Sequence, residues 1–165
     1  NLAMKKNPRL NSELDEEDDS VILKGHYDFN IAVDTDQGLM VPVIQDVDDK
    51  NIVELAREVG EKAEKAREGN LGSEEMQNGT FSITNIGAIG GEEFTPIINH
   101  PQAAILGLGQ IKETAEVVEG EVVPRKTMKL SLSYDHRIVD GADAARFMND
   151  VVENLEDPDK MILEL

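Results

Sequence analysis

The sequence predicts an α/β fold in which a mixed β-sheet packs against helices as a sandwich. Two observations support this prediction. Several short segments alternate apolar and polar residues, as strands do, and two longer segments repeat apolar residues at helical spacing. The chain has 165 residues, of which 39% are apolar, and no internal repeat or low-complexity linker divides it. We therefore expect one domain with one substantial core.

The first half of the chain predicts two strands and a helix. Residues 28–34 alternate apolar and polar side chains, which is typical of a half-buried strand. After a turn, the apolar run at 39–44 predicts a strand buried on both faces, although Pro42 lacks an amide donor and favours a sheet edge or a bulge. Residues 51–68 repeat apolar side chains at helical spacing, and Gly69 is placed to end that helix. We expect this helix to pack on the sheet.

The second half predicts further strands and a hairpin. Residues 79–85 alternate, and the alternation places Thr84 on the face away from the apolar side chains. The run at 103–109 predicts a buried strand, and the valines that flank a Glu-Gly-Glu turn at 119–121 indicate a hairpin. Residues 127–134 alternate again and predict one more strand.

The two ends of the chain differ in what they indicate. Apolar residues at helical spacing predict a second helix over 142–156, which should end before Pro158. The first ten residues enter in mid-pattern and lack an initiator methionine. We therefore expect the chain to be part of a longer protein, incomplete at its amino terminus.

The charge balance argues against several classes of partner. The chain has 34 acidic residues against 16 Lys and Arg, a formal net charge of −18, which would repel nucleic acid or an anionic membrane surface. The acidic residues gather at 13–19 and 46–49, and we interpret them as a strongly hydrated surface, with a tail that binds a basic partner as the alternative.

Cysteine is absent from the sequence, which excludes disulfides, thiolate metal sites and a cysteine nucleophile. No apolar run approaches the length of a membrane span, and no signal peptide is visible. We therefore expect a soluble, cytoplasmic protein.

The segment YDHRIVDGA at 134–142 carries the side chains most capable of chemistry. It joins a predicted strand to a predicted helix, and loops held by rigid elements are where catalytic groups concentrate. An imidazole ordinarily titrates near pH 6.5, so His136 could act as a base. Asp140 could equally be a helix N-cap, with Asp143 three residues on, and Arg137 could be part of a surface ion pair. Both readings remain open at this point.

The remaining candidates are weaker. His26 and His100 stand alone, and no spacing resembles a set of metal ligands, so we expect no metal site. The glycines of 85–91 match neither the dinucleotide fingerprint nor the Walker pattern, which favours a role in turns.

Four blocks of sequence carry a resemblance to a known family. They occur in the family's order and approximate spacing, and they are GLMVPVI at 38–44, GTFSITNIGAIGG at 79–91, FTPIINHPQAAILGLG at 94–109 and SLSYDHRIVDGADAARF at 131–147. Together they resemble the catalytic domain of dihydrolipoyl acyltransferases, the core subunits of 2-oxo-acid dehydrogenase complexes. The resemblance covers essentially the whole chain, which we interpret as the carboxy-terminal portion of an acyltransferase catalytic domain over 1–165, without the lipoyl and peripheral-subunit-binding domains.

The resemblance implies a fold and roles for three residues. The fold is a mixed-sheet sandwich of the chloramphenicol-acetyltransferase-like type. His136 would be the general base that removes the proton from the attacking thiol, a contribution of about 10²- to 10⁴-fold. Thr84 falls where the family usually has serine and would donate to the oxyanion of the tetrahedral intermediate. Asp140 would orient the loop through hydrogen bonds, which is compatible with capping the helix.

The resemblance also implies partners. Coenzyme A and the lipoyl groups of a lipoyl domain would be substrates, with no permanently bound cofactor, and the residues that contact coenzyme A stay unknown. The chain would form a homotrimer that assembles into a larger core and serves the decarboxylase and dehydrogenase subunits. Two alternatives remain: a non-catalytic structural core subunit of the same complex, and a free-standing small-molecule acyltransferase.

Overall fold

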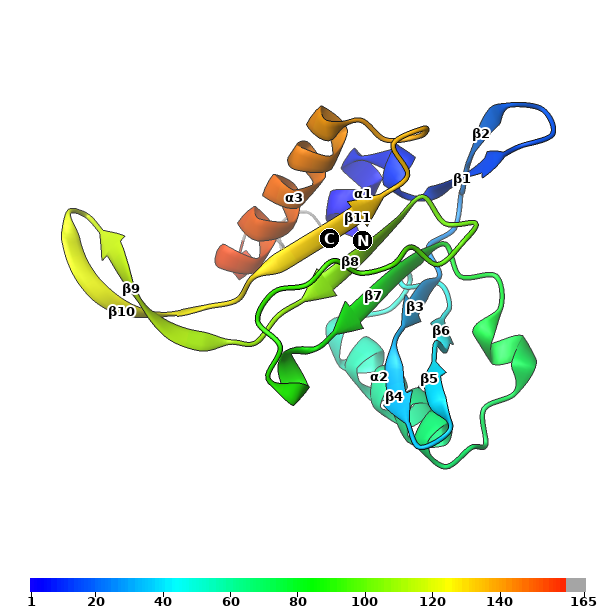
Figure 1. Cartoon of the computed structure of the whole chain (residues 1–165), viewed down its shortest axis with the longest axis horizontal. Coiled ribbons are helices and arrows are strands. Elements are labelled where there is room, and N and C mark those ends of the chain that lie inside the picture. Colours follow the sequence, from blue (N-terminus) through cyan, green and yellow to red (C-terminus); the bar gives the residue numbers. More distant parts are fainter. Residues whose placement is uncertain (160–165) are drawn as a thin grey trace.

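The structure, a computed structural model, describes residues 1–159 and is built on a five-stranded mixed sheet (Figure 1). The strands lie in the order β11 (Leu130–Tyr134), β8 (Ala104–Leu108), β7 (Phe81–Asn85), β3 (Phe29–Ile31) and β6 (Val43–Ile44). The central pairs β8–β7 and β7–β3 are parallel, whereas β11 and β6 pair antiparallel at the two edges. The predicted mixed sheet is confirmed.

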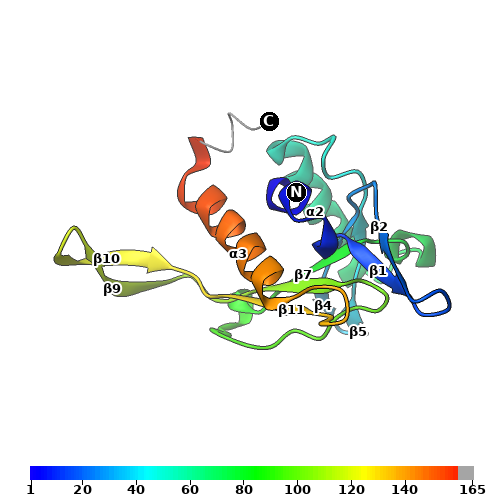
Figure 2. The ribbon, with the colours of Figure 1, turned by 90° about the horizontal axis from the view of Figure 1, so that it is seen from above.

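The helices α1 (Leu2–Lys6), α2 (Ile52–Arg67) and α3 (Gly141–Glu156) lie on one side of the sheet, as Figure 2 shows. Helix α2 begins with a capping box, in which the Asn51 side chain accepts from the Val53 and Glu54 amides and the Glu54 carboxylate accepts from the Asn51 amide. Gly69 follows its end with a φ of 71°. Both predicted helices are confirmed, within a residue or two at each end.

Three phenylalanines join the sheet to the helical layer. Phe81 lies at the centre of the core and is 1% exposed. Its ring centroid is 5.7 Å from that of Phe29 on the neighbouring strand and 5.8 Å from that of Phe147 on α3. Truncation of such a buried ring typically costs about 3–5 kcal/mol. The alternation predicted for 79–85 is therefore the alternation that builds the core.

The start of the chain differs from the sequence-based expectation. Helix α1 and a 3₁₀ turn at Pro8–Leu10 precede a hairpin of β1 (Ser12–Asp15) and β2 (Ser20–Leu23). The acidic run at 13–19, interpreted above as hydrated surface, supplies most of β1 and the exposed turn of this hairpin. Glu13 also forms a β-bridge with Gln102, so backbone pairing with a distant segment overrides local polarity.

The two strands predicted at 28–34 and 39–44 are each divided. The first consists of β3 and β4 (Val33–Thr35), and the second of β5 (Gly38–Met40) and β6. Pro42 lies at the break between β5 and β6, where its carbonyl oxygen accepts from the Ile31 amide at 2.9 Å. The expectation of an edge or an irregularity at this proline is confirmed, because β6 is an edge strand.

A long hairpin of β9 (Lys112–Val118) and β10 (Glu121–Thr127) projects from the body of the molecule (Figure 1). Its turn is formed by Glu119 and Gly120, with φ values of 52° and 86°, as a tight hairpin requires. The predicted hairpin is confirmed. Two further 3₁₀ turns lie at Ser73–Met76 and Gly87–Ile89. Within residues 1–159, no helix is long and apolar enough to cross a membrane.

Candidate functional site

His136 lies in the turn between β11 and α3, exposed at the end of the sheet. Its ring is tilted against that of Tyr134, with 5.5 Å between the centroids. No described residue hydrogen-bonds the imidazole. The ring lines a cavity of about 380 Å³ together with His100, Tyr134, Asp135 and Arg137. His136 is thus available to a ligand in that cavity.

The backbone of this turn is fixed on both sides of the histidine. The Asp135 amide donates to the Ala103 carbonyl at 2.8 Å, which ties the start of the turn to the sheet. The Asp135 carbonyl accepts from the Ile138 and Val139 amides, both at 3.0 Å. Ile138 and Val139 are buried in the core, 3% and 0% exposed. Between these anchored residues, His136 and Arg137 are exposed.

The side chain of Asp135 accepts hydrogen bonds from Arg137 on the other side of the histidine. Oδ1 accepts from the Arg137 amide at 2.9 Å, and Oδ2 accepts from Nη2 at 2.7 Å. These bonds with Arg137, chiefly those of its side chain, hold the pKa of the Asp135 carboxyl below its usual range. Arg137 Nη1 also donates to Glu16 in the β1–β2 turn at 3.0 Å. The ion pair considered for Arg137 from sequence is confirmed.

Asp140 caps helix α3. Its Oδ1 accepts from the Asp143 amide at 2.8 Å, and this bond lowers the pKa of the Asp140 carboxyl. The capping interpretation is confirmed. Among the described residues, Asp140 makes no hydrogen bond to His136, so its orienting role stays a prediction.

Thr84 lies near the carboxyl end of β7, half-buried, at the opposite end of the sheet from His136. It pairs with Gly107, whereas Tyr134 pairs with Ala104, three residues earlier on β8. With about 3.3 Å per residue and about 4.8 Å between strands, Thr84 lies on the order of 14 Å from Tyr134, and His136 lies farther still. Thr84 and His136 of one chain therefore cannot act on the same bond.

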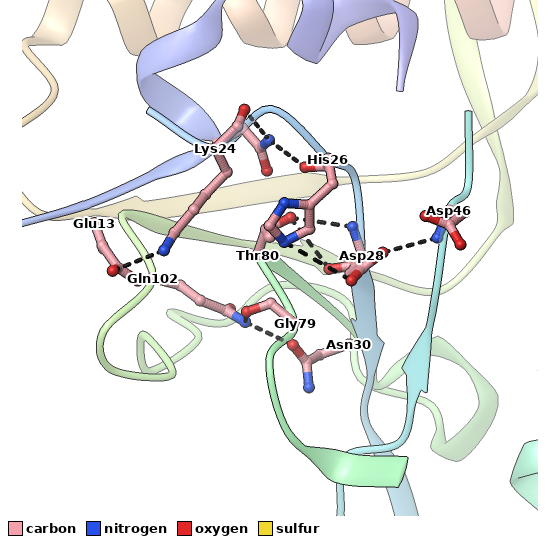
Figure 3. A network of polar contacts seen from close by, with 10 residues as sticks. Glu13, Lys24, His26, Asp28, Asn30, Asp46, Gly79, Thr80 and Gln102 are labelled. Carbon is pink, nitrogen blue, oxygen red and sulfur yellow. Dashed lines mark hydrogen bonds and ion pairs between the residues drawn. The ribbon is translucent and has the colours of Figure 1, made fainter. Parts of the chain in front are cut away.

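A buried polar network that sequence reasoning missed lies beside the histidine cavity (Figure 3). Gln102 Nε2 donates to Asn30 Oδ1 at 2.6 Å and to the Gly79 carbonyl at 2.8 Å, and its Oε1 accepts from Ser82 Oγ at 2.6 Å. Gln102 is 6% exposed. The sequence offered one indication of this network: Gln102 stands at the start of an apolar run, and an unpaired amide would be costly to bury there.

A second cavity, of about 610 Å³, adjoins the first. The two share His100, Pro101 and Gln102, and the second also reaches His26 and Lys24. In this cavity the side-chain amides of Gln102 and Asn30 hydrogen-bond to each other, and Lys24 Nζ forms an ion pair with Glu13 at 2.7 Å. Among residues 1–159, no three His, Cys, Asp or Glu side chains gather as a metal site.

Comparison with known proteins identifies the family. A model of the 2-oxoacid dehydrogenases acyltransferase catalytic domain matches residues 1–163. The acetyltransferase component of the Bacillus subtilis pyruvate dehydrogenase complex is 46% identical over 98% of this chain. The succinyltransferase component of the Bartonella vinsonii 2-oxoglutarate dehydrogenase complex is 47% identical over 99% of this chain. The chain spans 37% and 39% of these two relatives.

Solved structures agree. A structure of Azotobacter vinelandii dihydrolipoamide acetyltransferase, which addresses the catalytic roles of a serine, a histidine and an asparagine, is 42% identical. Its TM-score is 0.92, over 96% of this chain and 65% of that one. The cubic core of a pyruvate dehydrogenase complex is 43% identical and matches with a TM-score of 0.92, over 96% of this chain and 65% of that one. Chloramphenicol acetyltransferase is 17% identical and matches with a TM-score of 0.54, over 91% of this chain and 71% of that one. This likeness confirms the expected fold. The chain thus belongs to the 2-oxoacid dehydrogenase acyltransferase family, as a match to its catalytic domain.

Proposed function

We propose that the protein transfers an acyl group between dihydrolipoamide and coenzyme A within a 2-oxoacid dehydrogenase complex. Family membership supports the reaction class. The observation that carries the proposal is a shared spacing. In the Azotobacter vinelandii enzyme, the histidine follows the serine by 52 residues and precedes the asparagine by four. Thr84, His136 and Asp140 have the same spacing, 52 and four.

The proposed chemistry uses His136 as a base and then as an acid. Its imidazole accepts the proton of the coenzyme A thiol as the sulfur attacks the thioester carbonyl of the acylated lipoyl group. A free thiol, with a pKa of about 8.5, is only slightly ionised near neutrality, so this proton transfer accelerates attack. Collapse of the tetrahedral intermediate expels the dihydrolipoyl sulfur, and the imidazolium returns the proton to it. One thiol is consumed and one is released.

Thr84 supplies the oxyanion donor in this proposal. Its hydroxyl donates to the carbonyl oxygen as negative charge develops there, and loss of such a donor typically costs about 3 kcal/mol in the transition state. Threonine keeps the hydroxyl that serine has and adds a methyl group. No described residue hydrogen-bonds the Thr84 side chain, so the hydroxyl is available to a substrate.

Because Thr84 and His136 lie at opposite ends of one sheet, the proposed site forms between two copies of the chain. We propose a homotrimer in which each copy gives His136 to one site and Thr84 to another. Assembly of trimers into a larger core is supported by the cubic core of the related complex. A lipoyl domain, coenzyme A and the decarboxylase and dehydrogenase subunits are the proposed partners.

Coenzyme A and lipoyl groups act as substrates, and no permanently bound cofactor takes part. We place the complex in the cytoplasm, which agrees with a chain that has no cysteine. The acyl group stays open, because the relatives include both acetyl- and succinyltransferases.

The test is an acyl-transfer assay on the full-length protein. Acetyl- and succinyl-coenzyme A are each offered with dihydrolipoamide, and S-acyl dihydrolipoamide is measured. Transfer to the lipoyl thiol is the expected result. Assembly into a core without transfer of either group would instead favour the structural subunit. Transfer to small-molecule acceptors but not to dihydrolipoamide would favour a free-standing acyltransferase.

A further inference from the structure

His136 and Arg137 form the exposed tip of an otherwise anchored turn. Tyr134 precedes the turn in β11, and Ile138 and Val139 anchor its far side in the core. The His136 ring itself has no hydrogen bond to a described residue. The position of the ring therefore depends on how firmly the backbone at His136 is held. A base displaced by about 1 Å can lose about 10²-fold in rate.

We propose that Asp135 and Arg137 form a clamp across His136 that positions the base, an inference that rests on the proposed function. Both are positioning residues, since neither needs to touch the substrate. The family resemblance implies that Asp140 orients the loop, but in the structure Asp140 caps the start of α3. The bonds that span the histidine come instead from Asp135.

The geometry of the clamp restrains backbone and side chain together. Asp135 Oδ1 accepts from the Arg137 amide at 2.9 Å, which closes a tight turn directly over the His136 peptide. The same carboxylate receives the guanidinium in a fork, with Nε at 3.1 Å from each oxygen and Nη2 at 2.7 Å from Oδ2. Such a bidentate pair fixes orientation as well as distance. The backbone of His136, between the two ends, therefore has little freedom to move.

The Asp135 end of the clamp is itself anchored. The Asp135 amide donates to Ala103, so one end is fixed to the strand β8 region. The Asp135 side chain is 20% exposed, which protects its pair with Arg137 from solvent better than the outer pair of Arg137 with Glu16, exposed by 55% and 62%. Exposed pairs of that kind contribute little. The Asp135 half of the clamp should therefore carry the effect.

The clamp persists over the pH range in which an imidazole titrates. The bonds from Arg137 lower the pKa of the Asp135 carboxyl. Because this pKa is lowered, the ion pair stabilises the turn at any pH above the ordinary pKa of an aspartate. The stabilisation is lost only as the pH falls through the lowered pKa of Asp135. The carboxylate stays ionised near neutrality, so loosening of the clamp does not contribute to a pH profile there.

The experiment compares Asp135→Ala with Asp135→Asn in the full-length protein. Alanine removes every clamp bond, and we expect kcat to fall about 10- to 100-fold with KM for acyl-coenzyme A and for dihydrolipoamide unchanged within about twofold. Asparagine keeps an oxygen for the Arg137 amide, so we expect a loss below about tenfold. The pH at which kcat falls on the acid side should stay where the parent protein has it, because the base is misplaced and not retitrated.

Arg146→Gln is the matched control. It breaks the ion pair of Arg146 with Asp143, whose atoms are 2.8 Å apart. The two side chains are exposed to a similar degree as Arg137 and Asp135, but they lie on α3, away from the turn. Its kcat should equal that of the parent. Thermal unfolding and particle size are measured for every variant.

Three results would overturn the clamp. One is an Asp135→Ala kcat within twofold of the parent. Another is an equal loss in Asp135→Asn and Asp135→Ala with a shifted pH profile, which would assign the effect to charge. A third is loss of folding or assembly in both variants, which would assign a purely structural role. His136→Ala is assayed in parallel: retained activity there overturns the proposed function itself, whereas inactivity beside an unaffected Asp135→Ala overturns the clamp alone.

Discussion

The two ends of the central sheet are held together in different ways. At the His136 end, polar side chains make the connections: Gln102 joins β3 to β7, and Asp135 spans the histidine turn. At the Thr84 end, backbone packs directly against backbone. The first arrangement depends on which polar atoms are present, and the second depends on the absence of side chains.

Glycines make the close packing at the Thr84 end possible. A Cβ at Gly87 would lie 2.5 Å from the Gly109 carbonyl oxygen, and a Cβ at Gly109 would collide with the carbonyl oxygen of Glu92. The Ile86 amide donates to the Leu108 carbonyl at 3.1 Å, which ties the start of the turn after β7 to β8. Gly87, which the sequence assigned to a turn, and Gly109, at the end of the predicted strand 103–109, thus allow three backbone segments to meet around the end of β7.

Single substitutions should therefore act differently at the two ends of the sheet. Changes in the exposed part of the His136 turn alter the placement or chemistry of the base, so they should lower the rate more than the stability. Changes that add atoms at the Thr84 end displace backbone, so they should lower the stability first. The following predictions test that division in order of expected effect.

His136→Ala should give the largest effect on rate. The side chain is exposed and has no hydrogen bond to a described residue, so the fold and assembly should be unchanged. Acyl transfer should fall by about 10²- to 10⁴-fold, the contribution of a positioned base. Steady-state kinetics beside analytical ultracentrifugation measure both properties. Turnover within tenfold of the parent would contradict the assignment.

Thr84→Val should lower kcat by about 10²- to 10³-fold while KM changes little. Valine keeps the shape of threonine and removes only the donor, whose partner develops charge in the transition state. Thr84→Ser is the control and should remain active. If the valine variant turns over normally, Thr84 is only a strand residue and the donor lies elsewhere. Its unfolding midpoint should match the parent, since no described residue uses the hydroxyl.

Gly109→Ala should lower the free energy of unfolding by about 1–3 kcal/mol, because the new methyl group meets the Glu92 carbonyl and backbone must shift. Urea unfolding measures the change. Gly60→Ala is the matched control within helix α2, where an added Cβ meets nothing within 4 Å. It should raise the stability by about 0.5–1 kcal/mol. Equal effects at the two glycines would contradict the close backbone contact assigned to Gly109.

Elements whose signals are local could be predicted from the sequence. The helices around 51–68 and 142–156, the hairpin at its Glu-Gly turn and the cap at Asp140 follow from periodicity and from residues a few positions apart. These signals hold because neighbours in the sequence are neighbours in a helix or a tight turn. The motif around His136 was equally visible, since it lies within one short loop.

The tertiary structure settles which distant groups meet. It gave the acidic run at 13–19 a strand through pairing with β2 and Gln102, and it gave Gln102 its partners on two strands. It also placed Thr84 and His136 at opposite ends of the sheet, through the strand register. Register and burial arise from contacts between residues far apart in the chain, and no local periodicity encodes them.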